Sequence, residues 1–156
     1  MTNYGRFGLP PEAQILMAAG DFIPGDGMRM AVWAFAVLKY VAPNSHLVLV
    51  GDGPERHRVM RLAWAVIFDD MRAHSIIDAH PLSLVGEADI VWGTHTRGGV
   101  EFLKAAASLG KPSLAFRTPD TERLEGLILT PPGDPVALAT ATRKVLGSLF
   151  GGGHPV

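Results

Sequence analysis

The alternation of strand-like and helix-like segments most constrains how this chain of 156 residues can fold. Short apolar runs typical of buried strands alternate with longer segments whose apolar residues recur at helical spacing. Such an order favours a parallel sheet with helices on both faces. We therefore expect an α/β fold, with a doubly wound, mainly parallel six-stranded sheet whose strands lie at residues 15–19, 46–50, 74–79, 89–92, 113–116 and 127–130.

Turn and capping residues indicate where the helices begin and end. Pro54 suits the first position of a helix, Gly110 suits the position just past a helix end, and Asp134 suits the cap of the last helix. The sequence predicts one domain over residues 1–150 and a flexible tail at residues 151–156. Helices are expected at residues 28–41, 55–68, 101–109 and from 135 onward, with one or two helical turns at 81–88.

Composition excludes several classes of function. The 14 Lys and Arg residues nearly balance the 15 Asp and Glu residues, which gives no support for a broad nucleic-acid or anionic-membrane footprint. The chain has no Cys, which excludes disulfides, thiolate catalysis and cysteine-ligated metals. No apolar stretch is long enough to span a bilayer, and no signal-peptide core follows the N-terminus. We therefore expect a cytoplasmic protein.

Ligands of doubly wound sheets bind at the carboxyl ends of the strands, which here lead into residues 20–27, 51–54, 93–100 and 117–123. The glycines of these loops present N–H groups to a phosphate or simply make tight turns. Arginines there suit phosphate as bidentate donors. The candidate ligand-binding residues are Gly20, Asp21, Gly53, His95, Arg97, Gly98, Gly99, Glu101 and Arg117.

Loop carboxylates raise the question of a metal site. Asp21, Asp26 and Asp52 are hard-cation ligands by type, but their spacing and number are incomplete. Capping of a glycine-rich turn is the favoured interpretation of Asp21 and Asp26. We expect no metal and no cofactor.

Aromatic residues on the predicted helices and strands are expected mostly in the core. The set comprises Trp33, Phe35, Trp64, Phe68 and Trp92. Trp64 lies beside Val66 and Ile67, which makes its helix apolar on more than one side. That pattern indicates an interface, with a missing partner domain or in a homodimer.

Four stretches, in a consistent order, resemble the C-terminal, nucleotide-sugar-binding half of GT-B glycosyltransferases of group 1, or family 4. They are residues 6–20, the Leu-Val-Leu-Val-Gly-Asp-Gly-Pro run at 47–54, residues 88–112 with their Ala-Asp strand and Gly-Lys-Pro helix end, and residues 131–139. The resemblance implies a Rossmann-like domain that holds a nucleotide diphosphate sugar. It does not by itself imply activity.

The chain departs from that family at the positions that carry its chemistry. The resemblance places an Arg and a Lys against the diphosphate, where this chain has Asp21 and Asp26. Two family glutamates fall at Arg97 and Ala105, or the first at Gly98 if counted forward from Ala88 and Asp89. Glu101 is the nearest carboxylate, but it is off register. The family's N-terminal half, which supplies the acceptor site, has no counterpart in the 156 residues.

These departures favour a degenerate donor site. The chain is then a non-catalytic binding or interaction module, or one half of a split transferase that a partner chain completes, and it is expected to be inactive alone. Two alternatives stay open. One is an active hexosyltransferase using a nucleotide diphosphate sugar in a rearranged site, with Arg97 and Arg117 on the phosphates. The other is a nucleotide-binding regulator.

Overall fold

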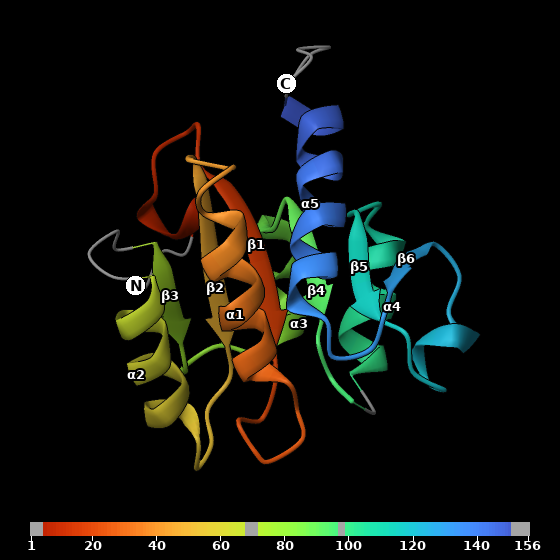
Figure 1. Ribbon diagram of the computed structural model, residues 1–156, viewed down its shortest axis with the longest axis horizontal. Helices are drawn as coiled ribbons and strands as arrows, with labels where there is room; N and C mark the ends of the chain where they lie inside the picture. The colour runs from red at the N-terminus through yellow and green to blue at the C-terminus, as the bar shows by residue number, and fades with distance from the viewer. Residues whose placement is uncertain (1–4, 68–71, 97–98, 151–156) are drawn as a thin grey trace.

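The computed structural model describes residues 5–67, 72–96 and 99–150, which form one sheet covered by helices (Figure 1). The sheet has six strands in the order β3-β2-β1-β4-β5-β6. Every neighbouring pair is parallel, which confirms the predicted sheet. The strands are β1 (Gln14–Ala19), β2 (Ser45–Val50), β3 (Ala73–Ile76), β4 (Ile90–Gly93), β5 (Ser113–Phe116) and β6 (Leu127–Thr130).

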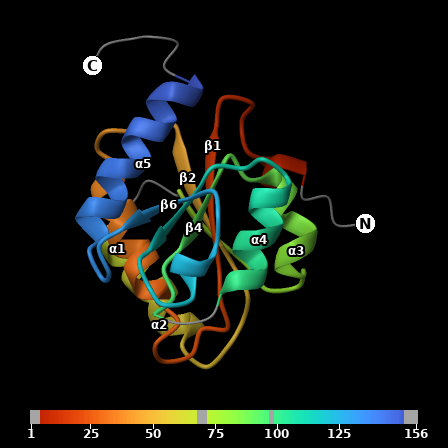
Figure 2. The same ribbon diagram turned by 90° about the vertical axis from the view of Figure 1, so that its right-hand side faces the viewer.

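Two helical layers enclose this sheet (Figure 2). One layer contains α1 (Met28–Leu38), α2 (Arg56–Val66) and α5 (Pro135–Phe150), with α1 packed against both of the others. The second contains α3 (Pro81–Leu84), η3 (Val85–Glu87) and α4 (Val100–Ser108). Short 3₁₀ turns η1 (Gly5–Gly8) and η4 (Thr121–Arg123) complete the described elements.

The alternation of side chains along β1 explains why both faces of the sheet are covered. Leu16 and Ala18 belong to the core beneath α1, α2 and α5, whereas Ile15 and Met17 belong to the core beneath α3 and α4. All four are essentially inaccessible to solvent. A strand buried on both faces reads as a continuous apolar run, as strands of parallel sheets do.

Trp92 of β4 anchors the last helix to the sheet. Its indole Nε1 donates a hydrogen bond of 2.9 Å to Oγ1 of Thr142 on α5, and both residues are fully buried. The predicted cap of α5 is confirmed, because Asp134 Oδ1 accepts a hydrogen bond of 3.0 Å from the backbone of Ala137. The cap and the buried bond together fix where α5 begins and how it is rotated.

The expectation of an aromatic core is correct for Phe35 and Trp92, which are buried, and wrong for Trp33, whereas the exposure of Trp64 agrees with a helix that is apolar on more than one side. Trp33 is 41% exposed and Trp64 is 64% exposed, because each lies on the side of its helix that faces away from the sheet. Phe68 lies outside the described residues.

The helix predicted at 28–41 ends earlier than expected. α1 stops at Leu38, and Val41, the last residue of the predicted range, is 50% exposed. The Val41 N–H bonds the carbonyl of Leu38, so the chain tightens there and rotates Val41 away from the core. No described helix combines the length and the apolar character that crossing a membrane requires.

Candidate functional site

A cleft lies at the carboxyl edge of the sheet, where the strand order reverses between β1 and β4. This switch point is where doubly wound sheets bind ligands. The cleft has a volume of about 580 Å³, within the range of small-molecule sites. Its walls come from the loops after β1, β3 and β4 and from the start of α4.

The loop after β1 is held against the loop after β4 by close backbone contact. Gly27 has φ +79°, and a Cβ there would lie 1.7 Å from the carbonyl oxygen of Thr94. Only glycine permits this approach. Thr96 Oγ1 donates a hydrogen bond of 2.6 Å to the carbonyl of Gly25, which joins the same two loops. The floor of the cleft is therefore fixed by the backbone.

The Gly-Asp-Gly-Pro turn at residues 51–54 supports the same loop from below. A Cβ on Gly51 would lie 1.9 Å from the carbonyl oxygen of Gly20, and one on Gly53 would lie 1.8 Å from that of Asp21. These close contacts with carbonyl oxygens explain why positions 51 and 53 are occupied by glycine. Gly53 does not line either described cavity, whereas Gly20 and Asp21 line the cleft.

The charged side chains on the described wall of the cleft are carboxylates. Asp21, Asp26 and Glu101 line it, and no Lys or Arg does so among the described residues. Asp26 accepts hydrogen bonds from the backbone N–H groups of Met28 (3.2 Å) and Ile23 (3.3 Å). It thus closes its own turn and satisfies a free N–H group at the start of α1.

Arg97 and Gly98, two predicted site residues, lie outside the described residues. Gly99 and Glu101, which follow them, line the cleft. Ala105, at the position of a family glutamate, is half-buried on α4 and packs against the core beneath that helix. Within the described ranges, no three His, Asp or Glu side chains are grouped so that they could hold a metal ion.

His95 sits between the cleft and a second, smaller cavity. Its ring packs on Gly99, where a Cβ would lie 2.5 Å from Nδ1. Nδ1 is buried and has no hydrogen-bond partner among the described residues. Burial lowers the pKa of His95, opposed by the charges of Asp26 and Asp21 and by a backbone hydrogen bond with Ala19. Burial therefore favours the neutral form of the imidazole.

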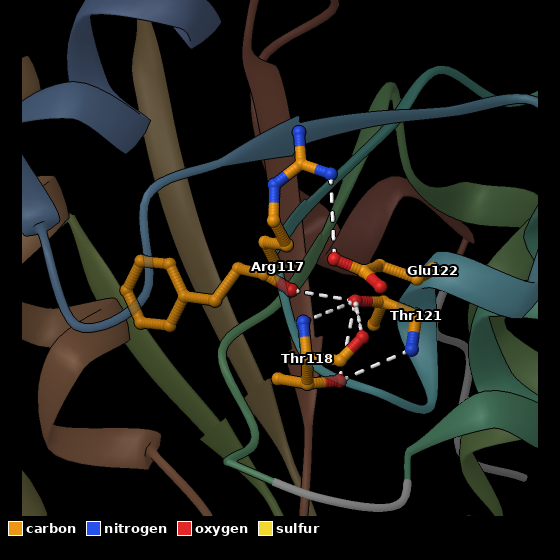
Figure 3. Close-up of polar contacts among 5 residues, drawn as sticks. Arg117, Thr118, Thr121 and Glu122 are labelled. Atoms are coloured by element: carbon orange, nitrogen blue, oxygen red, sulfur yellow. Dashed lines mark hydrogen bonds and ion pairs between the residues drawn. The ribbon is translucent and has the colours of Figure 1, made fainter.

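Arg117 lies on the second cavity, of about 290 Å³, and does not line the larger cleft. Its guanidinium pairs with Glu122 at 3.5 Å, and both side chains are about half exposed (Figure 3). Thr121 holds this loop: its Oγ1 donates to the carbonyl of Phe116 and accepts from the N–H of Thr118, each at 2.8 Å. The structure thus separates Arg117 from Gly20, Asp21, Gly99 and Glu101, whereas His95 lines both cavities.

The candidate residues chosen from the sequence do not include the wall supplied by the segment after β3. His80, Pro81 and Leu82 line the cleft although they are distant in sequence from its other residues. His80 caps α3, since its Nδ1 accepts a hydrogen bond of 3.1 Å from the N–H of Leu82. Ile23 and Phe102 add apolar surface to the same cleft. A signal existed for this wall, because His80 directly precedes Pro81 at the carboxyl end of a predicted strand.

No protein-family model and no curated protein sequence matches the chain. Solved structures do match. HepE of Anabaena in complex with UDP-glucose has a TM-score of 0.75 and 20% identity, over 88% of this chain and 40% of its own. The catalytic domain of a cholesterol-α-glucosyltransferase from Helicobacter pylori has a TM-score of 0.72 and 17% identity, over 88% of this chain and 89% of its own.

The chain has the fold of these glycosyltransferases. A UDP-forming trehalose-phosphate synthase from Burkholderia xenovorans matches in the same way, with a TM-score of 0.69 and 16% identity over 87% of this chain and 37% of its own. The predicted resemblance to GT-B glycosyltransferases is confirmed for the fold. The chain spans about two fifths of HepE, the first of these structures.

Proposed function

We propose that this glycosyltransferase-fold domain does not itself transfer a sugar and serves as a non-catalytic binding module, alone or as one half of a split transferase completed by a partner chain. The observation that carries the proposal is the charge of the cleft. Asp21, Asp26 and Glu101 line it, without a described cation to meet a diphosphate. A transferase needs positive groups where charge develops on the leaving diphosphate.

The position of Asp26 supports this proposal further. Its two hydrogen bonds to Met28 and Ile23 hold the carboxylate within the loop, so it has little freedom to turn away from an arriving phosphate. Like charges about 4 Å apart repel by roughly 1 kcal/mol in water and by roughly 4 kcal/mol near a protein surface. The cleft also has apolar walls, which Ile23, Leu82 and Phe102 supply. An uncharged nucleoside or sugar therefore suits it better than a nucleotide diphosphate.

Thermal unfolding with uridine, UDP and UDP-glucose tests the proposal. A ligand at about 100 times its Kd stabilises a protein by roughly 2.7 kcal/mol, which raises the Tm by several degrees. We expect neither UDP nor UDP-glucose to raise the Tm more than uridine does. A larger shift with UDP-glucose than with uridine would contradict the proposal.

The variant Asp21→Arg sharpens this experiment, because Asp21 is exposed and the new cation would face the cleft. Reversing one charge near a phosphate changes binding by about 2 kcal/mol at the dielectric of water, or roughly thirty-fold in Kd. We expect Asp21→Arg to gain affinity for UDP by that factor. Glu12→Arg is the matched control, since Glu12 is exposed just before β1, at the end of that strand opposite to the cleft. An equal gain in both variants would place the effect outside the cleft.

The alternative is an active hexosyltransferase with a rearranged site. Two observations favour it. The cleft lies at the β1–β4 switch point, where doubly wound sheets bind ligands, and the chain shares its fold with HepE, whose structure contains UDP-glucose. Under this alternative Arg97 contacts the diphosphate. Release of glucose from UDP-glucose by the purified chain, lost in Arg97→Ala and kept in Lys104→Ala on the exposed side of α4, would establish it against the main proposal.

A further inference from the structure

The helical layer formed by α1, α2 and α5 carries charge of one sign. The three helices contain six Arg and Lys residues and no Asp or Glu. Arg56 is the one of the six that pairs with a carboxylate among the described residues, bonding Asp52 at 3.2 Å. The other five are exposed and form no ion pair in the described part of the chain: Arg29, Arg58, Arg61, Arg143 and Lys144.

These cations share the outward side of the layer with aromatic and aliphatic side chains. On α1, Arg29, Trp33 and Val37 follow at intervals of four, the spacing of one helix face, and all are exposed. On α2, Arg61 and Trp64 lie one turn apart, also exposed. Because α1 packs against both α2 and α5, the outer sides form one continuous surface (Figure 1). We call this surface, with its five free cations and Trp33, Val37 and Trp64, the basic helical face.

We propose that the basic helical face docks on an anionic lipid bilayer. Each Lys or Arg near an anionic leaflet contributes about fivefold to binding, and five of them together suffice for stable adsorption. Indole rings favour the headgroup level, where an apolar body and an N–H group are both satisfied. Trp33 and Trp64 are 41% and 64% exposed between the cations, as such anchors must be. The three helices lie along one face of the sheet, so their outer sides can contact a flat surface together (Figure 2).

The charge of this face argues against a second copy of the chain as its occupant. A twofold dimer through the face would bring two sets of five unpaired cations together. The exposed apolar groups argue against nucleic acid. Val37, 40% exposed beside Trp33, has no partner in a phosphate-lined groove, whereas a bilayer buries it. This inference concerns a surface separate from the cleft and does not rest on the proposed function.

Cosedimentation of the full chain with vesicles tests the docking. The vesicles are of phosphatidylcholine, alone or with about one third phosphatidylglycerol, at physiological and at high salt. We expect binding to the anionic vesicles, loss of that binding at high salt, and none to the neutral ones. Tryptophan emission should shift to the blue on binding. The shift reports Trp33 and Trp64, since Trp92 is fully buried in the free protein.

Matched double variants locate the surface. Arg58→Gln/Arg61→Gln removes two cations of the basic helical face and should weaken vesicle binding about thirty-fold. Lys104→Gln/Arg123→Gln makes the same change in net charge at exposed positions outside that face and should bind like the unaltered chain. All four substituted side chains are exposed, so we expect both variants to fold, and a Tm measurement checks this. Equal loss in the two variants, equal binding to neutral vesicles, absence of binding, or tighter binding to a DNA duplex than to vesicles would each overturn the proposal.

Discussion

Gly27→Ala tests how the two loops at the floor of the cleft are held together. The backbone at Gly27 is left-handed, with φ +79°, which costs an L residue about 1–2 kcal/mol. The added Cβ would also lie 1.7 Å from the Thr94 carbonyl oxygen, so the loop must move. Overpacking of this kind costs about 1–3 kcal/mol. We expect a total loss of about 3–4 kcal/mol in the free energy of unfolding.

Two other glycines separate the causes. Gly110 is also left-handed, with φ +71°, but a Cβ there meets nothing within 4 Å. Gly110→Ala should therefore show the backbone cost alone, about 1–2 kcal/mol. Gly53 has no left-handed φ, yet a Cβ would lie 1.8 Å from the Asp21 carbonyl oxygen. Gly53→Ala should show the steric cost alone, about 1–3 kcal/mol.

Urea and thermal unfolding of the three variants measure these costs. For a domain of this size, 1 kcal/mol shifts the Tm by about 2–4 °C, so Gly27→Ala should lower it by roughly 10 °C. Gly110→Ala should lower it by only a few degrees. If Gly27→Ala were no more destabilising than Gly110→Ala, the close approach of Gly27 to Thr94 would not constrain the native state, and the reasoning would fail.

Three further predictions follow from buried or capping groups. Thr142→Val leaves the buried indole N–H of Trp92 without its acceptor and should lower the free energy of unfolding in urea by about 1–3 kcal/mol. Thr142→Ser keeps a hydroxyl and should cost less. Equal losses in the two variants would mean that this hydrogen bond does not stabilise the fold. Burial lowers the pKa of His46 and His74, whose ring nitrogens lie 3.1 Å apart. As the pH falls, these histidines therefore take up protons at a higher pH in the unfolded chain than in the folded chain. Stability should be complete above the ordinary histidine pKa of 6.5 and fall as the pH drops below it, and His74→Gln should flatten this dependence in unfolding measured across a pH series. An unchanged slope would refute that assignment. Asp26→Ala removes the bonds to two backbone N–H groups and should lower the free energy of unfolding by about 1 kcal/mol; no measurable loss would show that water replaces the cap.

The fold was predictable because its signals are local. β5 and β6 begin and end where the apolar runs at 113–116 and 127–130 do, and Asp134 caps the last helix as its type and position indicate. Strand and helix order then restrict the topology, since parallel strands need crossovers that return to the same sheet edge. The candidate site was predictable in part for the same reason, because Gly20, Asp21, His95, Gly99 and Glu101 all follow carboxyl ends of central strands.

Which distant segments come into contact was not predictable from the sequence, even where a local pattern placed a residue at the carboxyl end of a strand. His80 and Leu82 join the cleft only because β3 and β4 lie on opposite sides of β1 and their loops converge there. Gly27 is required by the carbonyl of Thr94, which is far along the chain. Such requirements depend on strand order and register, which a local pattern does not contain.

The sequence by itself determined a parallel α/β fold with two carboxylates, Asp21 and Asp26, in the loop after the first strand, since periodicity, turn residues and motif positions are properties of neighbouring residues. The tertiary structure alone decided how the charges are distributed. A net charge of -1 predicted no electrostatic footprint, yet among the described residues the fold gathers five cations without an ion pair on the basic helical face and three carboxylates in the cleft. Net charge is a sum over the chain, whereas the field at a surface depends on which residues the fold brings together.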